Sequence, residues 1–148
     1  MPDNPEMSAT QGGWADVVPE IVRHIVAQLN PLLPPGLALL ATGSQVVLST
    51  TGQAPQVVGT QAPRLPQVVD RRILAEVAAD VLDDVQDLII SHIATPWPVT
   101  KTGKSTHASS DLAGASLALR FSSRDGSDSI ELQPYEVPAK PPNTSVAG

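Results

Sequence analysis

A long two-faced pattern between Val68 and Ala94 constrains the fold more than any other feature of this 148-residue chain. Apolar residues recur there with a period of about 3.6, which is typical of an amphipathic α-helix. The apolar face comprises Ile73, Leu74, Val77, Ala78, Val81, Leu82, Val85, Leu88 and Ile89. The opposite face carries Glu76, Asp80, Asp83 and Asp87. We therefore predict a helix roughly 40 Å long, with one buried face and one acidic face.

A shorter helix is predicted upstream, from Asp16 to Asn30. Asp16 is a favourable N-cap residue, and Pro19 falls in the first turn, where its missing N–H costs nothing. One apolar stripe follows, formed by Val18, Ile21, Val22, Ile25, Val26 and Leu29. The dipeptide Asn30-Pro31 predicts the end of the helix, because the residue before a proline disfavours helical geometry.

Two β-hairpins are predicted, one after each helix. The first joins 37–41 to 45–50 through Thr42-Gly43-Ser44, with a short edge strand at 56–59 and a linker at 60–67. The second has apolar residues at alternate positions on either side of a turn at 124–127. Its alternating residues are Leu117, Leu119, Phe121, Ile130 and Leu132. Between the long helix and this hairpin, Val99 to Ser110 is predicted to be a mobile polar loop.

These elements predict one α+β domain over 14–137, between disordered tails at 1–13 and 138–148. The expected order is α-β-β-(β)-α-β-β. The economical packing is a two-layer sandwich, with two helices on one face of a four- to five-stranded antiparallel sheet.

The order of these elements resembles that of the small acidic chaperones of type III secretion. The resemblance covers residues 16 to 137 in element order only, without a shared residue motif, and the usual third helix is missing. It implies a homodimer that binds a partner chain along its sheet and helices.

The composition argues against several classes of function. Acidic residues outnumber basic ones by 15 to 9, and the chain has only two Trp, one Tyr and one Phe, so phosphate attraction and base stacking are both weak. With no Cys, there is no thiol nucleophile, disulfide or Cys-ligated metal. The acidic, proline-containing start lacks the pattern of a secretory signal, and the longest apolar run, 37–41, is too short to cross a membrane. We therefore predict a cytoplasmic protein, and the residue usage suggests a bacterial or phage origin.

Catalytic and nucleotide-binding motifs are weak. Thr102-Gly103-Lys104-Ser105 resembles the end of a phosphate-binding loop, but Pro98 occupies the position of the first glycine. A Ser-His-Asp triad can be drawn from Ser105 or Ser109, His107 and Asp111, without a nucleophile elbow or oxyanion motif. We predict no enzyme activity, cofactor or metal. His24 and His107 are expected on the surface, and His92 on the apolar face of the long helix.

Two features remain as candidate interaction sites. The carboxylates Glu76, Asp80, Asp83 and Asp87 fit a solvated helix face first, a docking strip for a basic protein second and a divalent-cation site third. In Pro96-Trp97-Pro98, the tryptophan either packs near His92 against the core or projects as an anchor for a partner.

The sequence thus predicts a non-enzymatic module that binds other proteins or itself, as an accessory, assembly or adaptor protein. Edge strands of the hairpins are natural sites for a second copy or an extended peptide. Two alternatives stay open: a chaperone-like homodimer that sequesters an extended client, and a small hydrolase.

Overall fold

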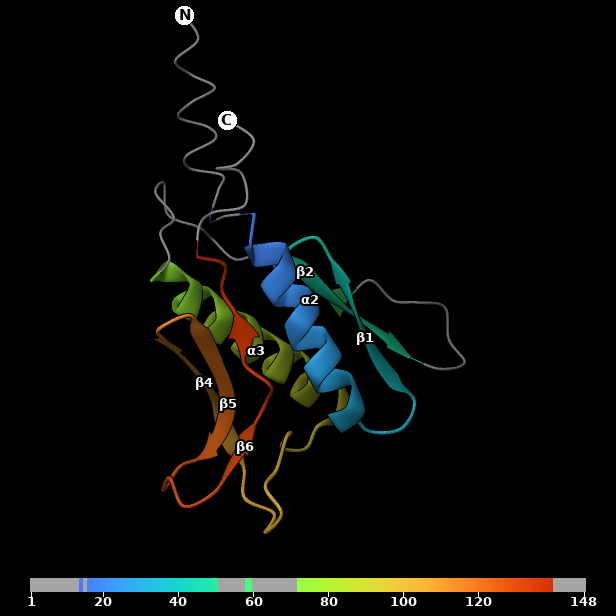
Figure 1. Cartoon of the computed structure of the whole chain (residues 1–148). Helices are drawn as coiled ribbons and strands as arrows, with labels where there is room; N and C mark the ends of the chain where they lie inside the picture. Colours follow the sequence, from blue (N-terminus) through green and yellow to red (C-terminus); the bar gives the residue numbers. More distant parts are fainter. Residues whose placement is uncertain (1–13, 15, 51–57, 60–71, 140–148) are drawn as a thin grey trace, which may run out of the picture.

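The computed structural model describes residue 14 and residues 16–50, 58–59 and 72–139. The predicted tails at 1–13 and from 140 onward, the linker at 60–67 and the first half of the strand at 56–59 lie outside these residues. The described elements confirm an α+β fold (Figure 1). In chain order they are α2 (Val18–Leu29), the 3-10 helix η1 (Asn30–Leu32), β1 (Leu37–Thr42), β2 (Gln45–Thr50), β3 (Val58–Gly59), α3 (Ile73–Ile93), β4 (Thr106–Ala113), β5 (Ser116–Ser123), β6 (Ser129–Glu131) and β7 (Tyr135–Glu136).

The strands form two antiparallel sheets, where the sequence analysis expected one. β1, β2 and β3 make the first sheet in that order, and β4, β5 and β6 make the second, with β7 also pairing with β5. α3 packs mainly on β4, while α2 packs on β1 and on α3 (Figure 1). Side-chain alternation shows which residues face a core, but it does not show which strands pair with one another. The strand count and order therefore differ from the prediction within a correct fold class.

The apolar stripe of α2 is buried as predicted, but the start of the helix differs. The helix begins at Val18, and its N-cap is Val17, which makes no side-chain capping hydrogen bond, so Asp16 is not the cap. Val17 is itself buried in the core. The helix thus begins directly after a buried valine, where we expected it to begin after a capping aspartate.

Helix α3 begins at Ile73, while the preceding residues of the predicted helix, 68–71, lie outside the described part. It ends at Ile93, where Ala94 adopts φ 60° and donates its N–H to Ile90 at 2.7 Å. The buried face is Leu74, Val77, Ala78, Val81, Leu82, Val85, Gln86 and Ile89. Gln86 is the unpredicted member of this face. Its amide group matters for the candidate site described below.

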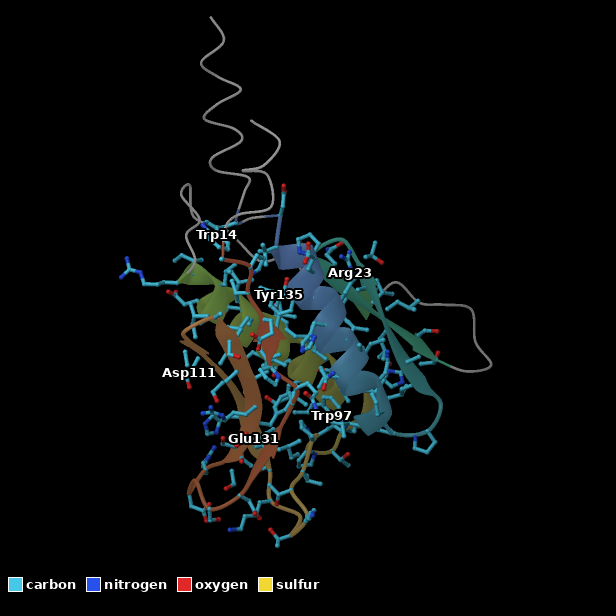
Figure 2. The ribbon with its side chains drawn as sticks, in the orientation of Figure 1. Trp14, Arg23, Trp97, Asp111, Glu131 and Tyr135 are labelled. Carbon is cyan, nitrogen blue, oxygen red and sulfur yellow. The ribbon has the colours of Figure 1, made fainter. Side chains whose placement is uncertain are left out.

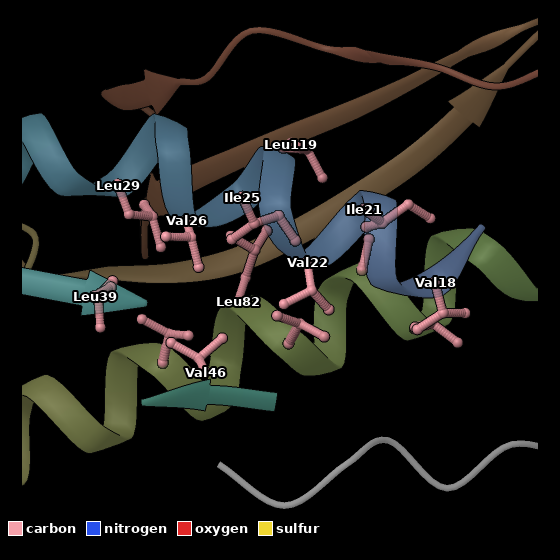
Figure 3. Packing of buried hydrophobic residues seen from close by; sticks show 14 of the residues in the cluster. Val18, Ile21, Val22, Ile25, Val26, Leu29, Leu39, Val46, Leu82 and Leu119 are labelled. Carbon is pink, nitrogen blue, oxygen red and sulfur yellow. The ribbon is translucent and has the colours of Figure 1, made fainter. Parts of the chain in front are cut away.

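The core lies between the two helices and the inner faces of both sheets (Figure 3). Its largest fully buried side chains include Phe121, Ile21, Ile25, Leu29, Leu39, Leu74, Leu82, Ile89, Leu117 and Leu119. Both predicted hairpins are present. Gly43 at φ 60° closes the β1–β2 turn, and Phe121 faces Ile130 across β5 and β6.

The predicted mobile loop at 99–110 is wrong for its second half. Thr106–Ala113 form strand β4, which pairs with β5 along its whole length. Val99 and Ser105 also form an isolated bridge that closes the segment between them. The sequence of β4 has no alternating apolar pattern, because the small residues Ala108 and Ser110 occupy its inner face, where α3 packs.

Candidate functional site

The outer edge of β4 is the first part of the candidate site. Ser123 donates its N–H to Asp128 at 2.8 Å, so its backbone faces β6 and not its β4 partner, Thr106. Since backbone groups alternate along an antiparallel pair, Thr106 points its own N–H and C=O away from β5. The same alternation directs the backbone groups of Ala108, Ser110 and Leu112 outward; we call these three residues the β4 edge.

The β4 edge is open within the described residues. Gln86 Nε2 donates to the Thr106 carbonyl at 2.8 Å and thereby covers the residue that precedes the edge. Within the described residues, β4 pairs with β5 alone, and the outward backbone groups of Ala108, Ser110 and Leu112 meet no second strand. An unpaired row of backbone donors and acceptors is a template for another strand.

Ser110 lies at the centre of the β4 edge and adds a second unpaired group. Its side-chain Oγ is buried and has no hydrogen-bond partner in the described structure. Ser110 faces Leu119 of β5, so its side chain is on the inner, helix-covered face of the sheet. A buried hydroxyl without a partner is costly, and a strand placed alongside β4 would bring groups able to bond it.

The outer edge of β1 offers a contrast, because a side chain closes it. Asn30 Oδ1 accepts the Leu39 N–H at 2.8 Å, and Asn30 Nδ2 donates to the Leu39 carbonyl at 3.1 Å. The amide thus takes the place of a neighbouring strand at that residue. Leu37 also donates its N–H to Pro34, at 3.3 Å.

The predicted acidic residues Glu76, Asp80, Asp83 and Asp87 form an exposed row on α3; we call them the acidic row. Burial raises the pKa of Asp83, the negative charges of Asp87 and Asp80 raise it further, and His107 opposes them. Burial, followed by repulsion from Asp80, Asp87 and Asp83, likewise raises the pKa of Asp84. α3 packs on β4, so the acidic row lies on a helix that borders this strand.

The proline-flanked Trp97 is a core residue and is only 7% exposed. Its Nε1 donates to the Leu32 carbonyl at 3.1 Å, and its ring meets Phe121 edge-on at a centroid distance of 6.1 Å. The Trp97–Pro98 peptide bond is cis; Pro96 is exposed and Pro98 is buried. The tryptophan therefore packs inward, as the first of the two interpretations predicted. Its aromatic neighbour is Phe121. His92, the neighbour that we expected, is exposed and does not lie on the buried face of α3.

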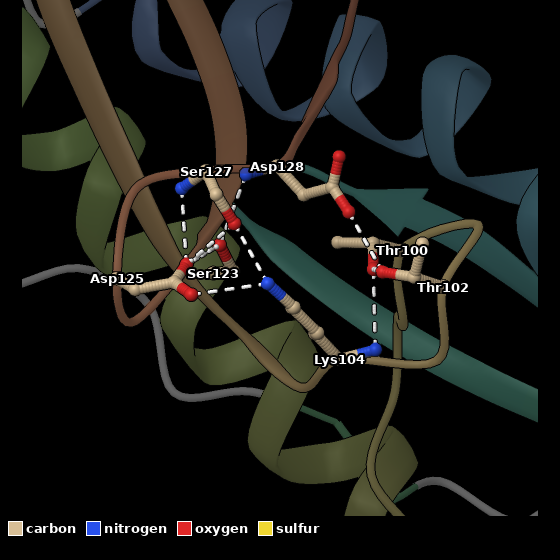
Figure 4. A network of polar contacts seen from close by, with 7 residues as sticks. All are labelled: Thr100, Thr102, Lys104, Ser123, Asp125, Ser127 and Asp128. Atoms are coloured by element: carbon tan, nitrogen blue, oxygen red, sulfur yellow. Dashed lines mark hydrogen bonds and ion pairs between the residues drawn. The ribbon is translucent and has the colours of Figure 1, made fainter.

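The phosphate-loop-like segment is tied to the β5–β6 turn by polar contacts (Figure 4). Lys104 Nζ bonds Asp125 at 3.0 Å and Ser127 at 2.7 Å, and Thr102 donates to Asp128 at 2.8 Å. Hydrogen bonds from Ser127 and Ser123, together with Lys104, hold the pKa of Asp125 well below its usual range. Lys104 thus already has an anionic partner, and β4 follows it where a phosphate loop requires a helix.

The residues of the conceivable catalytic triad do not converge. His107 and Asp111 both lie on β4, four residues apart, which separates them by about 13 Å along an extended strand. Ser109 lies between them on the same face, and Asp111 is paired with Arg120 at 3.4 Å. No hydrogen bond within the described residues joins His107 to a serine or to Asp111.

A further polar contact group was not predicted from the sequence. Tyr135 Oη donates to Glu20 at 2.9 Å, His24 Nε2 bonds the Gln133 carbonyl at 2.7 Å, and Gln133 donates its N–H to Gln28 at 3.0 Å. Glu20, His24 and Gln28 recur at i, i+4 and i+8, which places them on one face of α2. This spacing was the sequence signal that could have identified the group. Figure 2 shows Tyr135 against α2. Burial and the Glu20 hydrogen bond raise the pKa of Tyr135 to about 12.

Neither α2 nor α3 has the length and apolarity that crossing a bilayer requires. In residues 14, 16–50, 58–59 and 72–139, no three His, Asp or Glu side chains are grouped to hold a metal ion. Comparisons with protein-family models, curated proteins and solved structures give no match to this chain.

Proposed function

We propose that this chain is a non-enzymatic protein-binding module that adds an extended segment of another protein to the β4 edge. The observation that carries the proposal is the open row of backbone groups on Ala108, Ser110 and Leu112. Strand addition of this kind gains main-chain hydrogen bonds from the edge and selectivity from alternate side chains. An accessory, assembly or adaptor role follows from such binding; a cytoplasmic setting and a bacterial or phage origin remain predictions from composition.

The contrast between the two sheets supports this choice of surface. The β1 edge already has the Asn30 amide on Leu39. At β4, the corresponding cover ends at Thr106, where Gln86 bonds the carbonyl. Proteins usually protect the edges of long strands. The edge of the eight-residue strand β4 is uncovered beyond Thr106 within the described residues, which supports its choice as a pairing site.

Peptide selection on the full chain tests the proposal. Random peptides displayed on phage are selected on the wild-type chain, and the amide NMR signals of the chain are recorded with the selected peptides. We expect the largest changes in amide chemical shift at Ala108, Ser110 and Leu112. Shifts confined to β1 or to the outer face of the second sheet would overturn the proposal.

Two matched proline variants provide the control. Ala108→Pro removes an outward N–H from β4, and Ala41→Pro does the same on β1, at positions where an edge strand accepts proline. Binding should fall about tenfold or more, roughly 1.4 kcal/mol, with Ala108→Pro only. Equal binding by both folded variants would contradict strand addition at β4. If Ala108→Pro does not fold, the amide NMR signals of the wild-type chain with bound peptide still show whether the peptide binds at β4.

A further inference from the structure

We infer that the segment bound at the β4 edge is basic, with Lys or Arg at alternate positions facing α3. This inference rests on the proposed function and specifies the chemistry of its partner. Three observations carry it: the position of the acidic row beside the β4 edge, the lack of an ion pair on that row within the described residues, and the charge of the alternative occupant.

The acidic row lies on the flank of α3 that an added strand would reach. Gln86 marks the side of the helix that faces the outer edge of β4, because its amide bonds Thr106 there. At 3.6 residues per turn, Asp83 and Glu76 lie about 60° to 80° around the helix from Gln86. α3 also packs directly on β4. Inward-facing side chains of an added strand would therefore run past these carboxylates.

Among the described residues, the acidic row makes no ion pair, although the charge of His107 acts on Asp83. Within the described residues, ion pairs join Lys104 to Asp125 and Arg120 to Asp111, and neither pair includes a residue of α3. Repulsion among the row's own members contributes to the raised pKa of Asp83. Because the carboxylates repel one another, cations supplied by a partner would lower the free energy of the bound state more than neutral side chains would.

Charge also argues against a second copy of this chain at the same edge. Antiparallel pairing of two β4 strands would present Ala108, Ser110 and Leu112 of the second copy to α3, and none of these is a cation. It would also bring two acidic rows to the same face of the extended sheet. A basic extended segment satisfies the backbone groups, the Ser110 hydroxyl and the carboxylates together.

Synthetic peptides of about nine residues, the length of a long strand, provide the probes. One alternates Lys with Thr, one Gln with Thr and one Glu with Thr, and each is titrated into the full chain while the amide signals of β4 are followed. We expect the Lys peptide to bind about tenfold more tightly than the Gln peptide, and the Glu peptide to bind most weakly. About 0.5 M salt should remove most of this preference, because it screens charges beyond a few ångström.

Two double variants with the same change in net charge separate local from overall electrostatics. Glu76→Gln with Asp83→Asn removes two of the four carboxylates of the acidic row. Glu131→Gln with Glu136→Gln removes two exposed acids of β6 and β7 in the second sheet. We expect the first variant to reduce the Lys-over-Gln preference at least about threefold, and the second to leave it within error.

The outcomes distinguish the two proposals. Equal binding of the Lys and Gln peptides at β4 would overturn the basic partner and leave the proposed function in place. If no peptide shifts the β4 signals, both proposals fail. A dimer in sedimentation that Ala108→Pro dissociates would also overturn the basic partner, since a second copy would then occupy the edge.

Discussion

The outer edges of β1 and β4 both carry backbone donors and acceptors that no neighbouring strand binds in the described chain, but they differ in how side chains cover these groups. At β1, the Asn30 side chain supplies both a donor and an acceptor to Leu39. At β4, Gln86 supplies one donor to Thr106, and the backbone groups further along have no such cover in the described chain. A side-chain amide can therefore close an edge, and we propose that a partner strand binds where such cover stops.

The largest effect on this comparison is expected from Gln86→Leu. The buried amide of Gln86 donates to the carbonyls of Trp97 and Thr106, at 3.2 and 2.8 Å. Leucine has a similar volume but leaves both carbonyls without this donor, so we expect the free energy of unfolding to fall by roughly 2–4 kcal/mol. Urea unfolding measures the loss.

The control for Gln86 is Ser91→Leu, on the exposed side of the same helix. It should change the unfolding free energy by less than about 0.5 kcal/mol. If Gln86→Leu changed the unfolding free energy as little as Ser91→Leu, the Gln86 amide would not be what holds the beginning of β4 to α3. Thr106 could then no longer be treated as a covered residue in contrast to the open residues that follow it.

The next effect is expected from Asn30→Ala, which opens the β1 edge. The change leaves the partly buried N–H and C=O of Leu39 without partners, so we expect a loss of about 1–3 kcal/mol. The exposed edge should also promote self-association, which sedimentation at increasing protein concentration detects. Asn30→Asp keeps the acceptor for the Leu39 N–H but loses the donor, and it should recover part of the stability. An unchanged unfolding free energy in Asn30→Ala would show that the side chain does not close this edge.

Ser110→Ala should have a small effect of the opposite sign. The buried Oγ of Ser110 has no partner in the described structure, so its removal should leave stability unchanged or raise it by up to about 1 kcal/mol. The matched variant is Ser123→Ala, because the buried Ser123 Oγ donates to Asp125 at 2.8 Å and accepts from the Asp128 N–H at 3.1 Å. Ser123→Ala should therefore destabilise the chain. Thermal unfolding compares the two, and a clear loss in Ser110→Ala would mean that its hydroxyl is satisfied.

The helices and hairpins could be predicted from the sequence because their signal is carried by side chains. The apolar stripe of α2, the buried face of α3 and the alternation of Leu117, Leu119 and Phe121 all record burial directly. β4 could not be recognised in this way, since its inner face carries small or polar residues such as Ala108 and Ser110.

The candidate site was predictable only in part, for a related reason. The acidic row was visible because charge recurs at helical spacing. The open β4 edge was not visible in the sequence, because it consists of backbone groups. Every residue has these groups, so residue types do not indicate which of them are unpaired. The roles of Asn30 and Gln86 depend on which strand lies beside them, and that is a property of the tertiary fold.

The smallest expected effect is that of Asp83→Asn, which tests the acidic row itself. The folded-state pKa of Asp83 is raised above the ordinary 3.8, so ionisation of this carboxyl disfavours the folded state. Its unfavourable contribution is absent below pH 3.8 and develops as the pH rises through the folded-state pKa. We therefore expect Asp83→Asn to stabilise the chain by a few tenths of a kcal/mol at pH 7, and to have no effect at about pH 3. Thermal unfolding at the two pH values measures the difference. A stabilisation of the same size at both pH values would show that the effect does not come from charge. Repulsion within the acidic row would then no longer support binding of a basic partner.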